Sequence, residues 1–460
     1  MGIEEYLTEI KNQIRDKKAR EFVTNELQAH IEDRAEGLQN KGMDHDRAIL
    51  QAVEEMGDPV SVGVSMDRIH RPRLEWKFLL YVIYISILSL GVLYSVYIAL
   101  SSGNVGGSAF GYGYPKSHIA SILVGLVAMI IVYRLDYTFL AGRSRLIAAV
   151  FLILFTFLTM FFGVSINGVR RWIRFGGIIF SISALFLIYL PIFAGILYDY
   201  RKQGRTAVFK IFLWMIAPVF SQRLCGDGTI SFSMFMLFSE IILFMIVFNK
   251  NWYKVDRRKF MKGVGIGFFA VTALLVARIV KASDYQKARM QIWLSHFGLA
   301  SGGIVDSDMN YTAKCLEKIF QRSSFIGKSE SAIYILKNTP DALGDYILAS
   351  ISATCGKLAV GVIIISLMVL AIYIFGISVK QKNSLGSIVG CSCGIVIAVQ
   401  ALSNIFIVFG LLPSTATLLP FFSMSINNNL VVYILLGLVL SIYRYQDICV
   451  EKDPVITSAA

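Results

Sequence analysis

Long apolar runs alternate with short polar segments along most of this chain. From Trp76 onward, runs of roughly 18–25 residues recur, about the length that a helix needs to cross 30 Å of hydrocarbon. The pattern predicts an all-α polytopic membrane protein with both termini on the same side of the bilayer. Ten spans are expected, at 77–100, 117–134, 145–163, 177–198, 207–222, 229–248, 260–280, 346–374, 386–412 and 429–444.

Residues 1–72 follow another pattern, with many charges and with apolar positions at helical spacing. Ile3 and Leu7 begin one predicted helix, a second follows, and Asp44 is a plausible N-cap for a third. The helical pattern stops at Gly57-Asp58-Pro59. This stretch resembles the small permease-prefix domain found ahead of various bacterial membrane proteins, which also ends in a G-D-P turn. We expect a helical domain without catalysis.

Loop charges predict the orientation in the membrane. Lys and Arg are concentrated in the loops on one side, for example at Arg201, Lys202 and Arg205, which marks that side as cytoplasmic. The prefix and the tail 451–460 are then cytoplasmic, whereas the long loop 281–345 lies outside. The same bias explains most of the net charge of +13, so no nucleic-acid partner is expected.

Composition supports the lipid bilayer as the environment of the chain. Hydrophobic residues make up 55% and charged residues 16% of the sequence, whereas soluble domains are about 45–50% apolar. Six Cys are scattered without a C-x-x-C pair, so neither a disulfide framework nor a zinc site is predicted. The charged N-terminus lacks the apolar stretch of a cleavable signal peptide.

One carboxylate stands where water meets hydrocarbon. Asp345 ends the long polar loop, and the apolar run after it contains a single charge, Lys357. A carboxylate deep in a bilayer costs several kcal/mol unless it is paired, whereas one at the rim stays ionised and can act on a lipid headgroup. Asp345 is therefore the predicted chemical centre.

A second outward loop carries cations against the charge rule. Arg170, Arg171 and Arg174 surround Trp172 between Asn167 and Gly177. Interfacial anchoring alone would explain the Trp. Three arginines at an outer interface suggest an anionic partner such as a phosphate.

Four motifs in order resemble the SEDS family, the FtsW/RodA/SpoVE group of bacterial cell-wall membrane proteins. Asn167–Gly177 matches the family's N-G-A-R/K-R-W-I-x-L-G-G, and Gln291–Gly303 matches its Q-x-x-x-S-x-x-x-x-x-S-G-G. Pro340–Ala349 aligns without a gap on P-E-A-H-T-D-F-I-F-A, which places the family's catalytic Asp on Asp345. Gly410–Ser423 matches G-L-L-P-x-T-G-x-x-L-P-F-x-S. The resemblance covers about 75–445.

The resemblance implies a fold, a place and a reaction. The fold is a ten-helix transmembrane domain over 73–450 behind a small cytoplasmic helical domain, in the bacterial plasma membrane. The reaction polymerises the glycan strand of peptidoglycan from the undecaprenyl-diphosphate-linked disaccharide-pentapeptide, lipid II, beside a class B penicillin-binding protein, in division, shape maintenance or sporulation.

The resemblance also implies roles for individual residues. Asp345 would be the catalytic base, and a divalent cation, Mg²⁺ or Mn²⁺, could accompany the substrate diphosphate, although no acidic cluster demands a metal. The residues that would contact substrate are Arg170, Arg171, Trp172, Arg174, Gln291, Ser295, Thr415 and Ser423.

Departures from the family pattern leave two alternatives open. Ala184 and Leu187 replace the family's Glu and Lys, and Leu343-Gly344 replaces the His-Thr before the catalytic Asp. The chain could be a catalytically degenerate scaffold that regulates a penicillin-binding protein. It could also transport the lipid-linked precursor, but a transport path is expected to contain paired charges in the membrane, and here those charges are lost.

Overall fold

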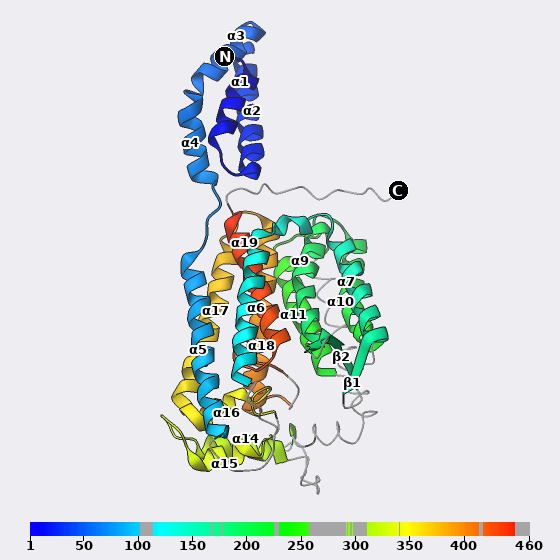
Figure 1. Cartoon of the computed structure of the whole chain (residues 1–460). Helices are drawn as coiled ribbons and strands as arrows, with labels where there is room; N and C mark the ends of the chain where they lie inside the picture. Colours follow the sequence, from blue (N-terminus) through cyan, green and yellow to red (C-terminus); the bar gives the residue numbers. More distant parts are fainter. Residues whose placement is uncertain are drawn as a thin grey trace.

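The computed structural model describes residues 1–101, 114–166, 169–175, 178–224, 230–256, 291, 293–294, 297, 311–339, 341–413 and 417–446. Figure 1 shows a bundle of long helices, with a small helical unit beyond one end that is formed by the N-terminal residues. These two parts follow the change of pattern in the sequence near residue 72.

Apolar positions at helical spacing form the core of the N-terminal unit, where Ile10 and Ile31 are fully buried. The Gly57-Asp58-Pro59 turn was predicted as the end of the helical pattern, but it begins a fourth helix. The Asp58 carboxylate accepts a hydrogen bond from the Ser61 N–H at 2.8 Å, and Pro59 occupies the first turn. The four helices are α1 (Ile3–Gln13), α2 (Lys17–Gln39), α3 (His45–Glu55) and α4 (Pro59–His70).

Within the described residues, seven helices are long and apolar enough to cross a membrane. They are α5 (Trp76–Ser101), α6 (Tyr114–Arg134), α7 (Ser144–Phe162), α10 (Arg205–Leu224), α17 (Lys357–Val379), α18 (Ser384–Val408) and α19 (Ile426–Arg444). Two further apolar helices are α9 (Tyr189–Asp199) and α11 (Ile230–Asn249). The span predicted at 260–280 lies outside the described residues.

Helices α18 and α19 form the centre of the bundle, since 72% of the apolar window of each is buried, against 17% for α7. Glycines allow α19 to approach α6 closely. A Cβ on Gly437 would lie 2.6 Å from the Met129 carbonyl oxygen, and one on Gly125 would overlap the Tyr433 ring. These contacts fix the position of α19 against α6. The first residues of α19 follow the predicted Gly410–Ser423 motif.

Large apolar side chains cover the outer faces of the bundle. On α7, Leu146, Ile153 and Phe161 are each about two-thirds exposed, as is Ile365 on α17. Exposing so large an apolar surface to water is unfavourable, whereas contact with the hydrocarbon of a bilayer is favourable. The chain is therefore a multi-pass membrane protein.

The span predicted at 346–374 is two helices, α16 (Ile347–Cys355) and α17, which meet at Gly356. The Gly356 φ is +93°, and a Cβ there would lie 2.7 Å from the Phe325 carbonyl oxygen. Hydropathy does not detect this break because both helices are apolar.

The long loop before Asp345 folds back against the bundle. Its described part includes α14 (Tyr311–Arg322) and α15 (Glu330–Lys337). Leu316 and Ile319 are buried, and the Phe320 ring lies 5.0 Å from the Phe409 ring, just after α18. Figure 1 shows α14 and α15 at the end of the bundle opposite the N-terminal unit.

Lys18 on α2 joins the N-terminal unit to the membrane domain. It forms an ion pair with Asp136, which lies between α6 and η1 (Tyr137–Leu140). The Lys18 ammonium also lies 5.2 Å from the centre of the Tyr445 ring, just after α19. The unit therefore rests on the ends of α6 and α19.

Candidate functional site

Asp345 is half-buried in the turn between α15 and α16. Figure 1 shows these two helices toward the end of the bundle opposite the N-terminal unit. The turn begins at Asp341, whose φ is +51°. The Asp341 carbonyl accepts hydrogen bonds from the N–H groups of Gly344 (2.9 Å) and Tyr346 (3.3 Å). The backbone on both sides of Asp345 is thereby tied to one carbonyl.

Asn404, near the end of α18, holds the same turn from the bundle core. Its side-chain amide donates to the Asp345 carbonyl at 2.8 Å and to the Thr417 carbonyl at 2.6 Å. The Asn404 side chain is fully buried, and its own oxygen has no hydrogen-bond partner among the described residues. Asn404 was not among the predicted site residues, although an amide inside the apolar span 386–412 is a signal, because polar groups in such spans need partners.

Ser423 connects the turn to the segment before α19. Its hydroxyl donates to the Gly344 carbonyl at 2.8 Å and accepts from the Leu419 N–H at 2.7 Å. The Met424 N–H also donates to the Leu343 carbonyl at 2.9 Å. The sequence suggested that Ser423 contacts substrate. In the structure its fully buried hydroxyl forms hydrogen bonds with two backbone groups, so Ser423 positions the turn.

Helices α5 and α6 hold the segment before α19 in turn. The Ser89 hydroxyl donates to the Phe421 carbonyl at 2.7 Å and lies 2.9 Å from His118 Nε2. Phe421 has a φ of +68°, a conformation that these bonds and its buried ring sustain. Asp345 is thus positioned by buried groups from several helices, an arrangement suited to catalysis or tight binding.

The arginine-rich loop forms a small antiparallel sheet. Its strands are β1 (Gly163–Ile166), β2 (Val169–Phe175) and β3 (Ile178–Ser181), in that order. Arg170, Arg171, Trp172 and Arg174 all lie on β2, where Trp172 pairs with Val164 and Ser181. Trp172 is half-buried and Arg174 is exposed. The predicted span 177–198 therefore starts as a strand and becomes helical only from Ile182.

The sheet is linked to the Asp345 turn through two helices. Strand β2 packs on α7 and on the short helix α8 (Ile182–Leu185), and α8 packs on α19, which begins three residues after Ser423. Figure 1 shows β1 and β2 toward the same end of the bundle as α14 and α15. Cationic and acidic groups therefore occupy one end of the membrane domain.

Of the other predicted contacts, Gln291 is exposed, whereas Ser295 and Thr415 lie outside the described residues. The Trp293 indole donates to the Leu411 carbonyl at 3.2 Å. This bond brings Trp293, which lies within the Gln291 motif, beside Leu411 of the Gly410–Ser423 motif, although the two are far apart in the sequence.

The positions of the family's missing charges are filled by apolar packing. Ala184 and Leu187 are buried at 8% and 3% exposure. Glu240 on α11, a carboxyl group that was not among the predicted site residues, is fully buried. Both Glu240 oxygens are buried without a hydrogen-bond partner among the described residues. A lone acid within the apolar run 229–248 is a recognisable signal of function.

A metal ion would need several oxygen or nitrogen ligands close together. In the part of the chain that the structure describes, no three His, Cys, Asp or Glu side chains form such a group.

Comparison with known proteins shows which family has this architecture. The model of the FtsW/RodA/SpoVE family, described as cell cycle proteins, matches residues 75–448. The chain is 23% identical to a probable peptidoglycan glycosyltransferase FtsW of Thioalkalivibrio sulfidiphilus, over 88% of this chain and 96% of the relative. It is also 23% identical to the stage V sporulation protein E of Bacillus subtilis, over 72% and 87%.

Solved structures show the same fold. A chain from a study of polymerisation and crosslinking by a peptidoglycan synthase complex superposes with a TM-score of 0.63 at 17% identity, over 81% of this chain and 99% of that one. The rod shape determining protein RodA of Thermus thermophilus superposes with a TM-score of 0.54 at 16% identity, over 81% and 97%. The chain therefore belongs to the FtsW/RodA/SpoVE family, the SEDS proteins.

Proposed function

We propose that this protein is a peptidoglycan glycosyltransferase that polymerises lipid II with Asp345 as general base, beside a class B penicillin-binding protein. The observation that carries the proposal is the anchoring of the Asp345 turn by the buried side chains of Asn404 and Ser423. A base must be held within hydrogen-bond reach of the proton that it removes. The names of the FtsW relatives support the same reaction.

In this reaction the Asp345 carboxylate takes the proton of the acceptor sugar hydroxyl. The hydroxyl oxygen attacks the anomeric carbon of the donor, and the bond from that carbon to the diphosphate breaks. The polyprenyl diphosphate leaves with the bonding electrons, so its charge must be neutralised. We assign this neutralisation to the arginines of β2, Arg174 foremost, and a divalent cation bound with the diphosphate would add to it.

Arg170 and Arg171 would join Arg174 on the diphosphate, and Trp172 would shield that side of the site. Gln291, Ser295 and Thr415 would bind the sugar or peptide part of lipid II, and Ser423 would act through the backbone. We place the Asp345 end outside the cell and both termini in the cytoplasm, because Lys and Arg dominate the loops at the other end.

A second candidate, a non-catalytic scaffold, is favoured by Ala184 and Leu187. Their apolar packing stands where the family pattern has a Glu and a Lys. Such a protein would bind a penicillin-binding protein without turning over lipid II.

The two candidates differ in their response to Asp345→Asn. The purified chain and its cognate penicillin-binding protein would be given fluorescent lipid II, and polymer would be resolved on a gel. We expect polymer formation to fall about 100-fold or more, the usual contribution of a general base. Asp341→Asn is the matched control, because Asp341 is an exposed acid of the same turn and Asn tolerates a positive φ.

Asp341→Asn should retain activity, and both variants should elute as folded protein. Wild-type rates from Asp345→Asn would contradict the proposal. Full complementation of a deletion strain by Asp345→Asn, with no polymer from wild-type protein, would establish the scaffold.

A further inference from the structure

A cavity of about 690 Å³ opens between α5, α17 and α19 at the end of the bundle next to the N-terminal unit. Its walls come from the first turn of α5, the last turns of α17 and the end of α19. Trp76, at the start of α5, is an aromatic residue of the kind that marks a membrane–water interface. The cavity therefore lies where lipid headgroups meet hydrocarbon.

The polar side of this cavity is cationic. Lys77, Lys380 and Lys382 line it, and Glu75 is its one lining carboxylate. The Tyr373 hydroxyl donates to that carboxylate at 2.6 Å, so Glu75 already has a partner. Lys77 and Lys380 are exposed side chains. Three lysines lining one opening favour an anion.

The other side of the cavity is apolar and open. Ile372 is 66% exposed, and a Cβ on Gly376 would meet no atom within 4 Å. Tyr373 forms a firm wall, because its ring stacks on Phe78 at 5.4 Å. A groove with cations at the interface and apolar residues along the next helical turn suits a ligand with an anionic head and a hydrocarbon chain.

We propose that this cavity binds an anionic phospholipid of the leaflet facing the N-terminal unit. The phosphate would lie among Lys77, Lys380 and Lys382, and an acyl chain would run past Gly376 and Ile372. A free phosphate would use only the cationic half, whereas the phospholipid uses both. The proposal is independent of the reaction at Asp345, which lies at the other end of the bundle.

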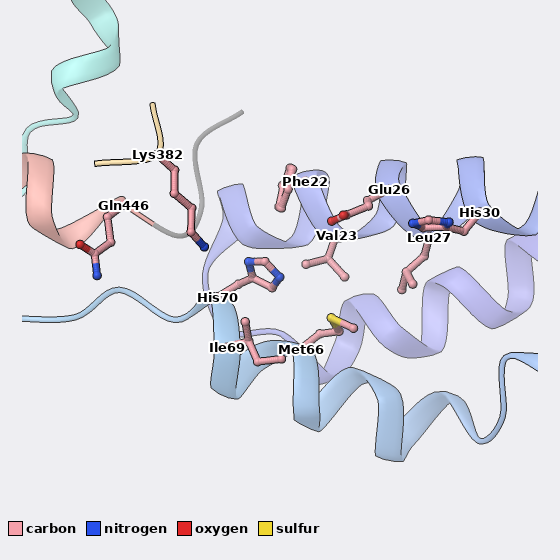
Figure 2. A pocket seen from close by; sticks show the side chains of 10 residues that line it. All are labelled: Phe22, Val23, Glu26, Leu27, His30, Met66, Ile69, His70, Lys382 and Gln446. Carbon is pink, nitrogen blue, oxygen red and sulfur yellow. The ribbon is translucent and has the colours of Figure 1, made fainter. Parts of the chain in front are cut away.

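The N-terminal unit adjoins this lipid site. Lys382 and Gln446 also line a second cavity of about 370 Å³, whose other walls include Phe22 of α2 and His70 of α4. Figure 2 shows Lys382 and Gln446 on the membrane-domain side of that cavity, with Lys382 extending toward His70. A bound lipid would thus contact Lys382, which also lines the cavity next to the N-terminal unit.

The test is native mass spectrometry of the full chain in detergent, titrated with phosphatidylglycerol or with phosphatidylcholine of identical acyl chains. Wild-type protein should bind phosphatidylglycerol at least tenfold more tightly. Replacing Lys77, Lys380 and Lys382 with Gln should weaken this binding by about fivefold for each lysine. Millimolar inorganic phosphate should leave the lipid bound.

Gly376→Leu fills the apolar half and should also release the lipid. Gly361→Leu is the matched control, because Gly361 lies on the same helix toward its other end and a Cβ there also meets no atom within 4 Å. Binding by the triple Gln variant equal to wild type would overturn the proposal. Equal losses in the two Leu variants, equal binding of the two lipids, or displacement by phosphate would do the same.

Discussion

At the end of the membrane domain that carries Asp345, buried side chains hold the backbone in place. Asn404, Ser423 and Ser89 each donate a hydrogen bond to a carbonyl of the Asp345 turn or of the segment before α19. At the end facing the N-terminal unit, buried side chains such as Ser441 also bond the backbone. The contacts made there with the N-terminal unit itself are the Lys18–Asp136 ion pair and a cation–ring contact, beside the rims of two open cavities.

The difference separates two kinds of surface. Preorganised groups suit a step in which charge moves between fixed atoms, because they need no rearrangement during the reaction. Open cavities lined by lysines suit ligands that exchange with the surrounding membrane and water. Variants that remove one contact at either end test this difference, because they compare the loss of stability with the loss of activity.

The largest effect is expected from Asn404→Ala, which removes two hydrogen bonds and leaves the Asp345 and Thr417 carbonyls without that partner. The free energy of unfolding should fall by about 2–4 kcal/mol, and polymer formation should fall with it. Thermal unfolding in detergent and the lipid II gel assay measure the two quantities.

Asn383→Ala is the control at the other end of α18, where the Asn383 side chain caps the helix by accepting from the Leu385 N–H. It should cost about 1 kcal/mol of stability without a loss of activity per folded molecule. Equal loss of activity in both variants would mean that Asn404 only supports the fold.

A smaller effect is expected from Ser423→Ala, about 1–3 kcal/mol, because the Leu419 N–H and the Gly344 carbonyl lose a buried partner. Ser441→Ala is its counterpart near the other end of α19, where the Ser441 hydroxyl donates to the Leu135 carbonyl at 2.5 Å. Both variants should unfold at lower temperature, but only Ser423→Ala should lower kcat. If Ser423→Ala raised KM alone, Ser423 would contact substrate directly.

The smallest effect is expected from Lys18→Ala. The Lys18 side chain is 45% exposed, and ion pairs of this kind contribute about 0–1 kcal/mol. Asp136→Ala should cost more, because Asp136 also accepts from the Thr138 N–H at 3.0 Å. The Lys18 effect should vanish in high salt, measured by thermal unfolding across a salt series. A loss above about 2 kcal/mol would show that the N-terminal unit is firmly docked.

Periodicity and hydropathy were sufficient for several features, because these are properties of neighbouring residues. The apolar runs predicted the long helices. The same local rules could not detect the break at Gly356, since the close approach of residues 325–327, distant in the sequence, requires a glycine there. The same rules predicted a loop where the structure has a three-stranded sheet. Its strands of four to seven residues are too short to show a clear alternation of apolar and polar residues.

Hydropathy and charge along the chain were enough to show that it spans a membrane and that its N-terminal unit is separate in pattern, and they predict Asp345 at a water–hydrocarbon boundary. The groups that hold Asp345 in place became visible only in the folded protein. Asn404 is 59 residues from Asp345 in the chain, and Ser423 is 79 residues from Gly344. Hydrogen bonds across such separations depend on how α16, α18 and α19 pack, and no local pattern of residues encodes that packing.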